Sequence, residues 1–96
     1  MKVKRTSPEL EAYYYDGQYA SYLDIFNAIK RFSKASTLTT WERDVPIYYF
    51  NPFLNQKVRF VEGEYIVIEK GEYSHDILLT ALYKEAFEEQ YEILEQ

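Results

Sequence analysis

The sequence contains no cysteine, one histidine, three glycines and three prolines, and it has no long apolar run. Without cysteine there is no disulfide, no thiolate nucleophile and no thiolate metal site, and nothing favours an oxidising compartment. Three glycines can hardly supply a phosphate-cradling loop, and no dinucleotide, nucleoside triphosphate, hydrolase or metalloprotease motif occurs. No apolar stretch approaches the roughly 20 residues of a membrane span. We expect a soluble cytoplasmic protein that binds no cofactor and no membrane.

The shortage of reactive side chains extends to metal and acid-base chemistry. His75 has no cysteine to pair with, so a metal site around it would need carboxylates such as Glu72 and Asp76. A loop histidine beside the start of a helix is the simpler interpretation. Carboxylate pairs are available in so acidic a chain, but nothing singles one out. We therefore expect no catalytic residue, no metal and no enzyme activity.

The sequence is rich in aromatic side chains, and its charge is unevenly distributed along the chain. Eleven tyrosines and six phenylalanines among 96 residues suffice for one core, in a single domain covering 1–96. The net charge is −5, but residues 1–60 carry nine Lys/Arg against six Asp/Glu, whereas residues 61–96 carry two against ten. The acidic surface thus belongs to the C-terminal third, with a net charge of −8. Because an acidic chain repels phosphate backbones, we expect no direct nucleic-acid binding.

The first third of the chain predicts a strand followed by a helix. The stretch "PELEAYYY" alternates like a strand, and Asp16-Gly17 ends it in a turn. A helix is predicted over about 19–34, with Ser21 and Asp24 resembling a capping box. Its apolar stripe falls at helical spacing and consists of Tyr22, Ile25, Phe26, Ile29 and Phe32. We expect Ile25, Phe26 and Ile29 to pack against Ile66 and Ile68.

The remaining two thirds predict more strands and a second helical segment. A short strand is expected around 38–41, and "PIYYF" and "KVRFV" read as a hairpin joined by "NPFLNQ". The most apolar strand, "EYIVIE", is expected to be central in its sheet. Helical spacing in "DILLTALYKEAF" predicts a C-terminal helical segment over about 76–89. The sum is an α+β fold, a small antiparallel meander sheet packed by one main helix.

Three stretches form a recognisable pattern: "KRTSPELEAYYYDG" near the N-terminus, and "VEGEYIVIEKGEY" and "EAFEEQYE" near the C-terminus. With them, both ends of the chain resemble a family of small phage and prophage proteins. In that family a basic strand ends in glutamate-alanine and a tryptophan before a glycine turn, and the C-terminal part carries glycine-aspartate-tryptophan-isoleucine and glycine-glutamate-phenylalanine strands and a phenylalanine-to-tyrosine-glutamate tail. Here these places are taken by Glu11-Ala12, Tyr15, Gly17, Gly63-Glu64-Tyr65-Ile66, Gly71-Glu72-Tyr73, Phe87 and Tyr91-Glu92. The middle, 35–58, does not match, and "SHDILLTALYK" replaces a cysteine-lysine-proline stretch. The resemblance implies a phage or prophage gene expressed in the cytoplasm of a bacterial host, and it assigns no activity.

The tyrosines near the N-terminus have two interpretations. As a platform, Tyr13 and Tyr19 would stack a base or nucleotide whose phosphate meets Arg31 or Arg43. As core, the rings fill the gap between sheet and helix; we expect this of Tyr15 and Tyr22. Neighbouring residues of a strand face opposite ways, so only one face of the "YYY" run is available for binding.

Two further stretches are candidate protein-binding surfaces. The turn pair Phe53-Leu54 is apolar, and if exposed it marks a partner or homodimer surface; the other interpretation folds this loop over the helix. The acidic run is either a phosphate-mimicking surface or a solvated helix face, and its expected contact residues are Glu85, Glu88, Glu89 and Glu92.

Three functional hypotheses remain open from the sequence. The leading one is a phage-encoded accessory protein that binds a host bacterial protein stoichiometrically, such as a component of a defence system. The alternatives are a small-ligand binder that sequesters a nucleotide signal, and a virion or assembly component. The direction of Arg31, Arg43 and Arg59 discriminates among them. Arginines beside an aromatic cleft favour the ligand binder, and arginines pointing into solvent favour a protein partner.

Overall fold

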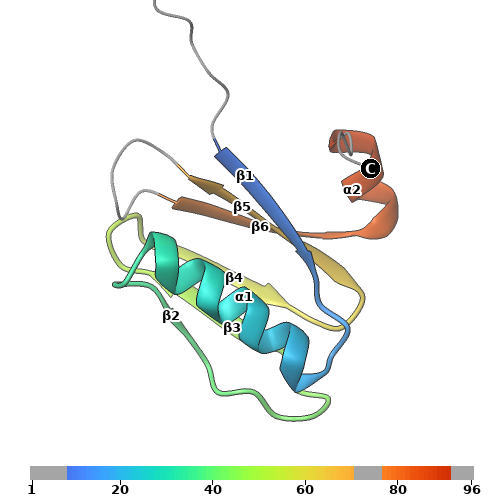
Figure 1. The fold of residues 1–96 in the computed structure, drawn as a ribbon, viewed down its shortest axis with the longest axis horizontal. Helices are drawn as coiled ribbons and strands as arrows, with labels where there is room; N and C mark the ends of the chain where they lie inside the picture. The colour runs from blue at the N-terminus through green and yellow to red at the C-terminus, as the bar shows by residue number, and fades with distance from the viewer. Residues whose placement is uncertain (1–8, 71–76, 92–96) are drawn as a thin grey trace, which may run out of the picture.

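The computed structural model describes residues 9–70 and 77–91, which form a small α+β fold (Figure 1). His75, Glu72 and Asp76 lie outside the described residues, as does Glu92. In chain order the elements are β1 (Glu9–Tyr14), α1 (Tyr19–Phe32), β2 (Thr37–Leu38), β3 (Ile47–Asn51), β4 (Gln56–Phe60), β5 (Glu64–Lys70), β6 (Ile77–Tyr83) and α2 (Lys84–Gln90).

The strands form two antiparallel sheets rather than the single meander expected from the sequence. One sheet has the order β1-β5-β6, so the apolar β5 is central, as predicted. The other has the order β2-β3-β4 and contains the predicted hairpin, in which Ile47 pairs with Phe60 and Asn51 with Gln56. Strand β2 covers Thr37–Leu38, at the beginning of the expected range of 38–41. The division follows from the long-range return of β1 to β5, which separates the local β2-β3-β4 unit from the rest.

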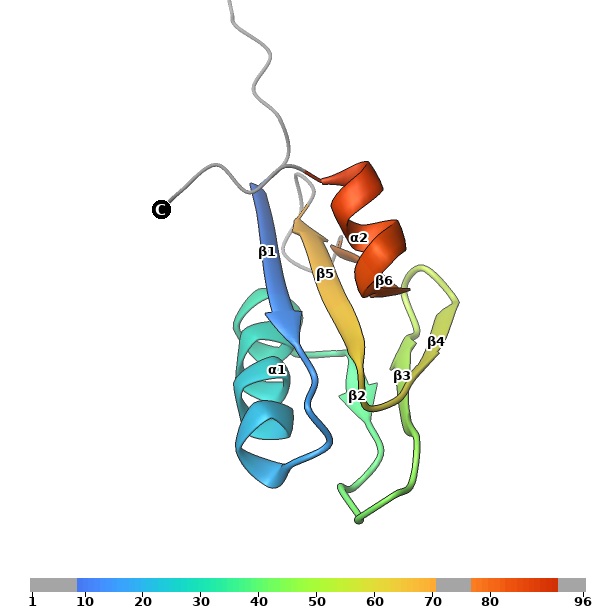
Figure 2. The same ribbon diagram turned by 90° about the vertical axis from the view of Figure 1, so that its right-hand side faces the viewer.

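Helix α1 confirms the predicted main helix and lies against both sheets (Figures 1 and 2). Ile25 and Ile29 are fully buried, in one core cluster with Ile66 and Ile68. Phe26 is only partly buried, because it lies at the flank of the buried stripe, beside Tyr22. The predicted burial of the stripe therefore holds for the two isoleucines and not for the phenylalanine.

The start of α1 differs from the predicted capping box. The N-cap residue is Gln18, and its side chain makes no capping hydrogen bond. The hydroxyl of Ser21 donates instead to the Asp16 carboxylate at 2.6 Å, and the same carboxylate accepts from the Gln18 amide at 2.9 Å. These two bonds lower the pKa of Asp16, since both favour the charged carboxylate. Asp16 therefore holds the turn before the helix, and Asp24 is exposed.

The predicted C-terminal helix over 76–89 is wrong in its first half. Residues 77–83 form strand β6, and the helix α2 begins only at Lys84. The stretch "ILLTALY" fits both a helix and a strand, because apolar residues occur at both its odd and its even positions. Pairing with β5, in which Ile77 lies opposite Lys70 and Tyr83 opposite Glu64, decides for the strand.

Two predicted core tyrosines are buried. Tyr15 packs edge-on against Phe60 with 5.3 Å between ring centroids, and the Tyr22 hydroxyl donates to the Thr39 carbonyl oxygen at 2.9 Å. The hydroxyl of a third buried tyrosine, Tyr49, lies 3.1 Å from that of the equally buried Ser36. Each of these side chains thus buries its ring; Tyr22 and Tyr49 also have hydrogen-bond partners. Within the residues described here, no helix has the length and apolar character that crossing a membrane requires.

Candidate binding surface

The hairpin tip between β3 and β4 presents an exposed apolar pair on a hydrogen-bonded turn. The side-chain oxygen of the fully buried Asn51 accepts from the backbone amides of Phe53 at 3.0 Å and Leu54 at 3.4 Å. Asn55 closes the turn in the left-handed region at φ 52°, which asparagine tolerates. Phe53 is 61% exposed and Leu54 38%. Of the two interpretations of this loop, the exposed one is therefore the one the fold adopts.

The outer face of the same hairpin alternates aromatic and cationic side chains. Alternation along the strands turns Ile47, Tyr49 and Phe60 into the core, and their neighbours therefore face outward. Antiparallel register places Tyr48 opposite Arg59 and Phe50 opposite Lys57. The Lys57 ammonium lies 5.9 Å from the centroid of the Phe50 ring. A shallow recess of about 300 Å³ opens here, and it is lined by Tyr48, Tyr49, Phe50, Lys57, Val58 and Arg59.

The outer face of the hairpin carries two positive side chains, Lys57 and Arg59, and no carboxylate of its own. The sequence from Val45 to Val61 contains no Asp or Glu. In the part of the chain that the structure describes, the two ion pairs are Arg31 with Glu11 and Lys84 with Glu88, so neither Lys57 nor Arg59 is neutralised by a carboxylate. The overall acidity of the protein therefore does not extend to the hairpin.

The first half of the predicted tyrosine–arginine ligand site forms a closed cluster. Tyr13 donates to the Glu11 carboxylate at 2.5 Å, and the Arg31 guanidinium lies 3.0 Å from the same oxygen. Arg31 also approaches the Tyr13 hydroxyl at 3.4 Å and stacks over the Phe32 ring at 4.9 Å. Burial raises the pKa of Tyr13, and the hydrogen bond to Glu11 adds to that effect. The polar groups of Tyr13 and Arg31 that would contact a nucleotide therefore already bond to Glu11 and to each other.

The second half of that predicted site lies elsewhere in the molecule. Tyr19 is exposed and packs against Tyr22 at 6.0 Å and edge-on against Trp41 at 5.6 Å between ring centroids. Arg43 is exposed on the connection between β2 and β3, and it does not line the recess on the hairpin. Of the three arginines that discriminate between hypotheses, Arg59 borders the aromatic recess on the hairpin, Arg31 is paired with Glu11, and Arg43 is exposed.

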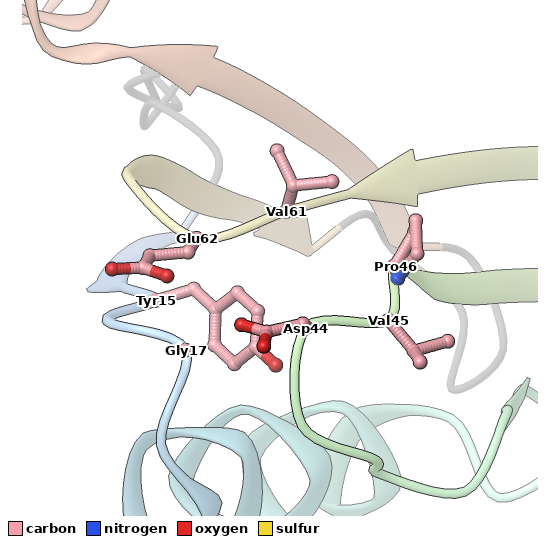
Figure 3. A pocket seen from close by; sticks show the side chains of 7 residues that line it. All are labelled: Tyr15, Gly17, Asp44, Val45, Pro46, Val61 and Glu62. Atoms are coloured by element: carbon pink, nitrogen blue, oxygen red, sulfur yellow. The ribbon is translucent and has the colours of Figure 1, made fainter.

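A second recess, of about 250 Å³, has acidic walls and was not predicted from the sequence (Figure 3). Three connections that are distant in the sequence supply its lining, which consists of Tyr15, Gly17, Asp44, Val45, Pro46, Val61 and Glu62. The Trp41 indole donates to the Gly17 carbonyl oxygen at 3.1 Å and so ties two of these connections together. Burial raises the pKa of Tyr15, and the nearby carboxylates act in the same direction. Carboxylates beside an aromatic ring suit a cationic group and not a phosphate.

The acidic helix α2 is anchored at the opposite end of the β1-β5-β6 sheet from the hairpin tip (Figure 1). Phe87 stacks on Tyr65 with 4.3 Å between centroids and an interplanar angle of 6°. Glu85, Glu88 and Glu89 are exposed, and Glu88 accepts from Lys84 at 2.8 Å. The predicted acidic surface is therefore solvent-facing in the described residues, with one of its carboxylates already paired.

Comparison of the chain with protein-family models, with curated proteins and with solved structures finds no match. The outer face of the hairpin therefore has to be interpreted from its own geometry. A signal for it was present in the sequence: once "PIYYF" and "KVRFV" are taken as a hairpin, alternation alone places Tyr48 and Phe50 on the face that carries Lys57 and Arg59.

Proposed function

We propose that the protein is a phage-encoded accessory protein that acts by stoichiometric binding to a host bacterial protein, for which a defence component is the first candidate. The observation that carries the proposal is the tip pair Phe53-Leu54, exposed on a turn that Asn51 holds in place. An exposed apolar pair is the kind of group that forms the centre of a protein interface. A turn fixed before binding loses little conformational entropy when the partner docks.

The charge distribution supports a second partner surface, acidic in character, besides the apolar tip. The acidic helix α2, with Glu85, Glu88 and Glu89 in solvent, would steer a basic partner during association. The tip would then supply the apolar contact that slows dissociation. The phage setting rests on the resemblance at the two ends of the chain. Nothing in this proposal requires a catalytic group.

The test compares a tip variant with a matched control during capture from the bacterial host. The tip variant is Phe53→Ser with Leu54→Ser; the control is Leu10→Ser with Tyr14→Ser, two similarly exposed apolar residues, 46% and 49%, on the outer side of β1. Tagged wild-type protein and the control are expected to retain one host protein near equal molar ratio, which mass spectrometry identifies. The tip variant is expected to lose it.

Circular dichroism and sedimentation complete this experiment. Both variants are expected to keep the wild-type circular dichroism spectrum, because the substituted side chains are exposed. Sedimentation of the wild type across a concentration series checks whether the tip instead joins two copies as a homodimer. Capture of the same protein by the folded tip variant, or capture of nothing by the wild type, would contradict the proposal.

A further inference from the structure

We propose that the outer face of the β3-β4 hairpin binds single-stranded nucleic acid, with bases on Tyr48 and Phe50 and phosphates at Arg59 and Lys57. This binding site is separate from the tip contact. It is defined by those four residues, which we call the hairpin face. The sequence-based expectation of no nucleic-acid binding came from the total charge, and the local charge of this face has the opposite sign.

The aromatic part of the argument is the exposure and spacing of the two rings. Tyr48 is 46% exposed and Phe50 is half-buried, and both stand on the side of β3 away from the core. Alternate residues of a strand stand about 6.8 Å apart, which is twice the rise per residue. Sheet faces with aromatic rings spaced in this way stack the splayed bases of a single strand, and such stacking is tolerant of sequence. Two outward rings at this spacing match the planar bases of a single strand.

The cationic part of the argument is the pairing of each ring with a positive group. Arg59 lies opposite Tyr48 and Lys57 opposite Phe50, so one aromatic–cation pair repeats along the hairpin. Neither cation has a carboxylate partner among the residues described, and the segment from Val45 to Val61 has none in its sequence. Two successive nucleotides present the matching repeat of base and phosphate. The complementary charge therefore favours a polyanion with planar groups.

Within residues 9–70 and 77–91, the elements next to this face leave it exposed. On one side β2 adds Thr37 opposite Phe50, and Thr39 accepts from the Tyr48 amide through its hydroxyl at 3.0 Å, so both neighbours are uncharged. The acidic helix α2 follows β6 and lies at the opposite end of the β1-β5-β6 sheet from the hairpin tip (Figure 1). A repeated pair on an open sheet face suits a continuous strand better than one free nucleotide, which would be enclosed in a pocket.

The test is fluorescence anisotropy with a labelled 12-nucleotide thymidine strand at low salt and across a salt series. Wild-type protein is expected to bind, with a slope of log K against log[salt] of about −1.4, since each of two neutralised phosphates contributes about −0.7. Tyr48→Ala with Phe50→Ala, and separately Lys57→Gln with Arg59→Gln, are expected to weaken binding about ten-fold or more. The second variant alters only exposed groups, so it keeps the test valid if the first fails to fold.

Matched controls separate this site from total charge and from the tip. Lys34→Gln with Arg43→Gln changes the net charge equally at exposed positions elsewhere, and Tyr14→Ala removes an exposed ring from β1. Both are expected to bind like wild type, as is the tip variant Phe53→Ser with Leu54→Ser, so this inference and the proposed function can fail separately. Absence of binding at low salt, or an equal loss in the controls, overturns the proposal. Competition by thymidine monophosphate at equal nucleotide concentration, or by polyglutamate at equal charge, overturns it in favour of a free nucleotide or an acidic protein.

Discussion

Gln56 and Leu79 exchange two hydrogen bonds across the boundary between the two sheets. The Gln56 side-chain nitrogen donates to the Leu79 carbonyl oxygen at 3.2 Å, and the Leu79 amide donates to the Gln56 side-chain oxygen at 3.2 Å. The side-chain amide of Gln56 therefore pairs with the backbone of β6 at Leu79, as a peptide group of a neighbouring strand would. It fixes the hairpin to the β1-β5-β6 sheet.

Removing this bridge is expected to destabilise the protein. Gln56→Ala leaves two part-buried backbone groups of Leu79 without their partners, which should lower the free energy of unfolding by about 1–3 kcal/mol. Urea unfolding followed by circular dichroism measures the change. Gln18→Ala is the matched control, because the Gln18 side chain is exposed and caps nothing. Equal stability of the two variants would show that the bridge contributes nothing.

The packing of α1 predicts that its isoleucines matter more than its phenylalanine. Ile25→Ala empties a fully buried site and should cost about 2–5 kcal/mol. Phe26→Ala removes a larger but only partly buried side chain, so its cost should be smaller. Chemical denaturation of both variants gives the order. The reverse order would place the main contact of the helix at Phe26.

Asn51 is expected to be essential for the shape of the hairpin tip. Asn51→Ala removes the acceptor of the Phe53 and Leu54 amides and should lower the free energy of unfolding by about 1–3 kcal/mol. Asn27→Ala, on the exposed side of α1, should leave stability unchanged or slightly raised because alanine favours helices. Thermal melts distinguish the two. An Asn51→Ala variant as stable as wild type would show that the turn holds itself.

Alkaline pH is expected to destabilise the protein through its buried tyrosines. Burial raises the pKa of Tyr49 in the folded state, and the contact with Ser36 opposes this effect without cancelling it. The unfolded state then loses its proton first, so this stabilisation is complete below pH of about 10, the unfolded pKa, and is lost as pH rises through the folded pKa. Melting temperatures from pH 8 to 11.5 should therefore fall less steeply for Tyr49→Phe. The exposed Tyr48→Phe should parallel wild type, and identical slopes for all three would contradict the assignment to Tyr49.

The acidic helix α2 is expected to tolerate partial neutralisation. Glu85→Gln with Glu89→Gln removes exposed carboxylates but keeps Glu88, which is paired with Lys84. The free energy of unfolding should be unchanged or slightly raised, because repulsion within the helix falls. Association with the captured host protein should slow and should lose part of its salt dependence. A rate that is indifferent to both changes would leave the helix face with no role beyond solvation.

Most elements could be predicted from the sequence because each has a strong local signal. The period of 3.6 residues through Ile25 and Ile29 indicated α1. Alternation in "KVRFV" and aromatic residues in "PIYYF" indicated the hairpin, and a continuous apolar run indicated β5. The helix prediction for 77–83 was wrong because Leu78 and Leu82 add apolar residues at the even positions of the strand. The pattern therefore fits a helix as well as a strand. Only the partner strand β5, which the local pattern cannot represent, decides between them.

The candidate surfaces were less predictable because they depend on contacts between distant residues. Exposure of Phe53 follows from a turn fixed by Asn51, and either fate of the loop was compatible with its composition. Tyr13 and Arg31 are 18 residues apart in the sequence and lie side by side in the fold, where Glu11 contacts both and satisfies their polar groups. The bridge from Gln56 to Leu79 has no local signature in the sequence, since a glutamine directly after a turn is ordinary.

The antiparallel return of β1 to β5 has a consequence for synthesis on the ribosome. Tyr14 leaves the ribosome about fifty residues ahead of its partner Tyr65, whereas Asn51 and Gln56 of the hairpin pair almost as soon as both emerge. Contacts between distant residues form more slowly than local ones. During translation the hairpin and its aromatic outer face are thus available while the opening strand of the chain still has nothing to pair with. The nascent chain therefore exposes its hairpin before the β1-β5-β6 sheet has formed.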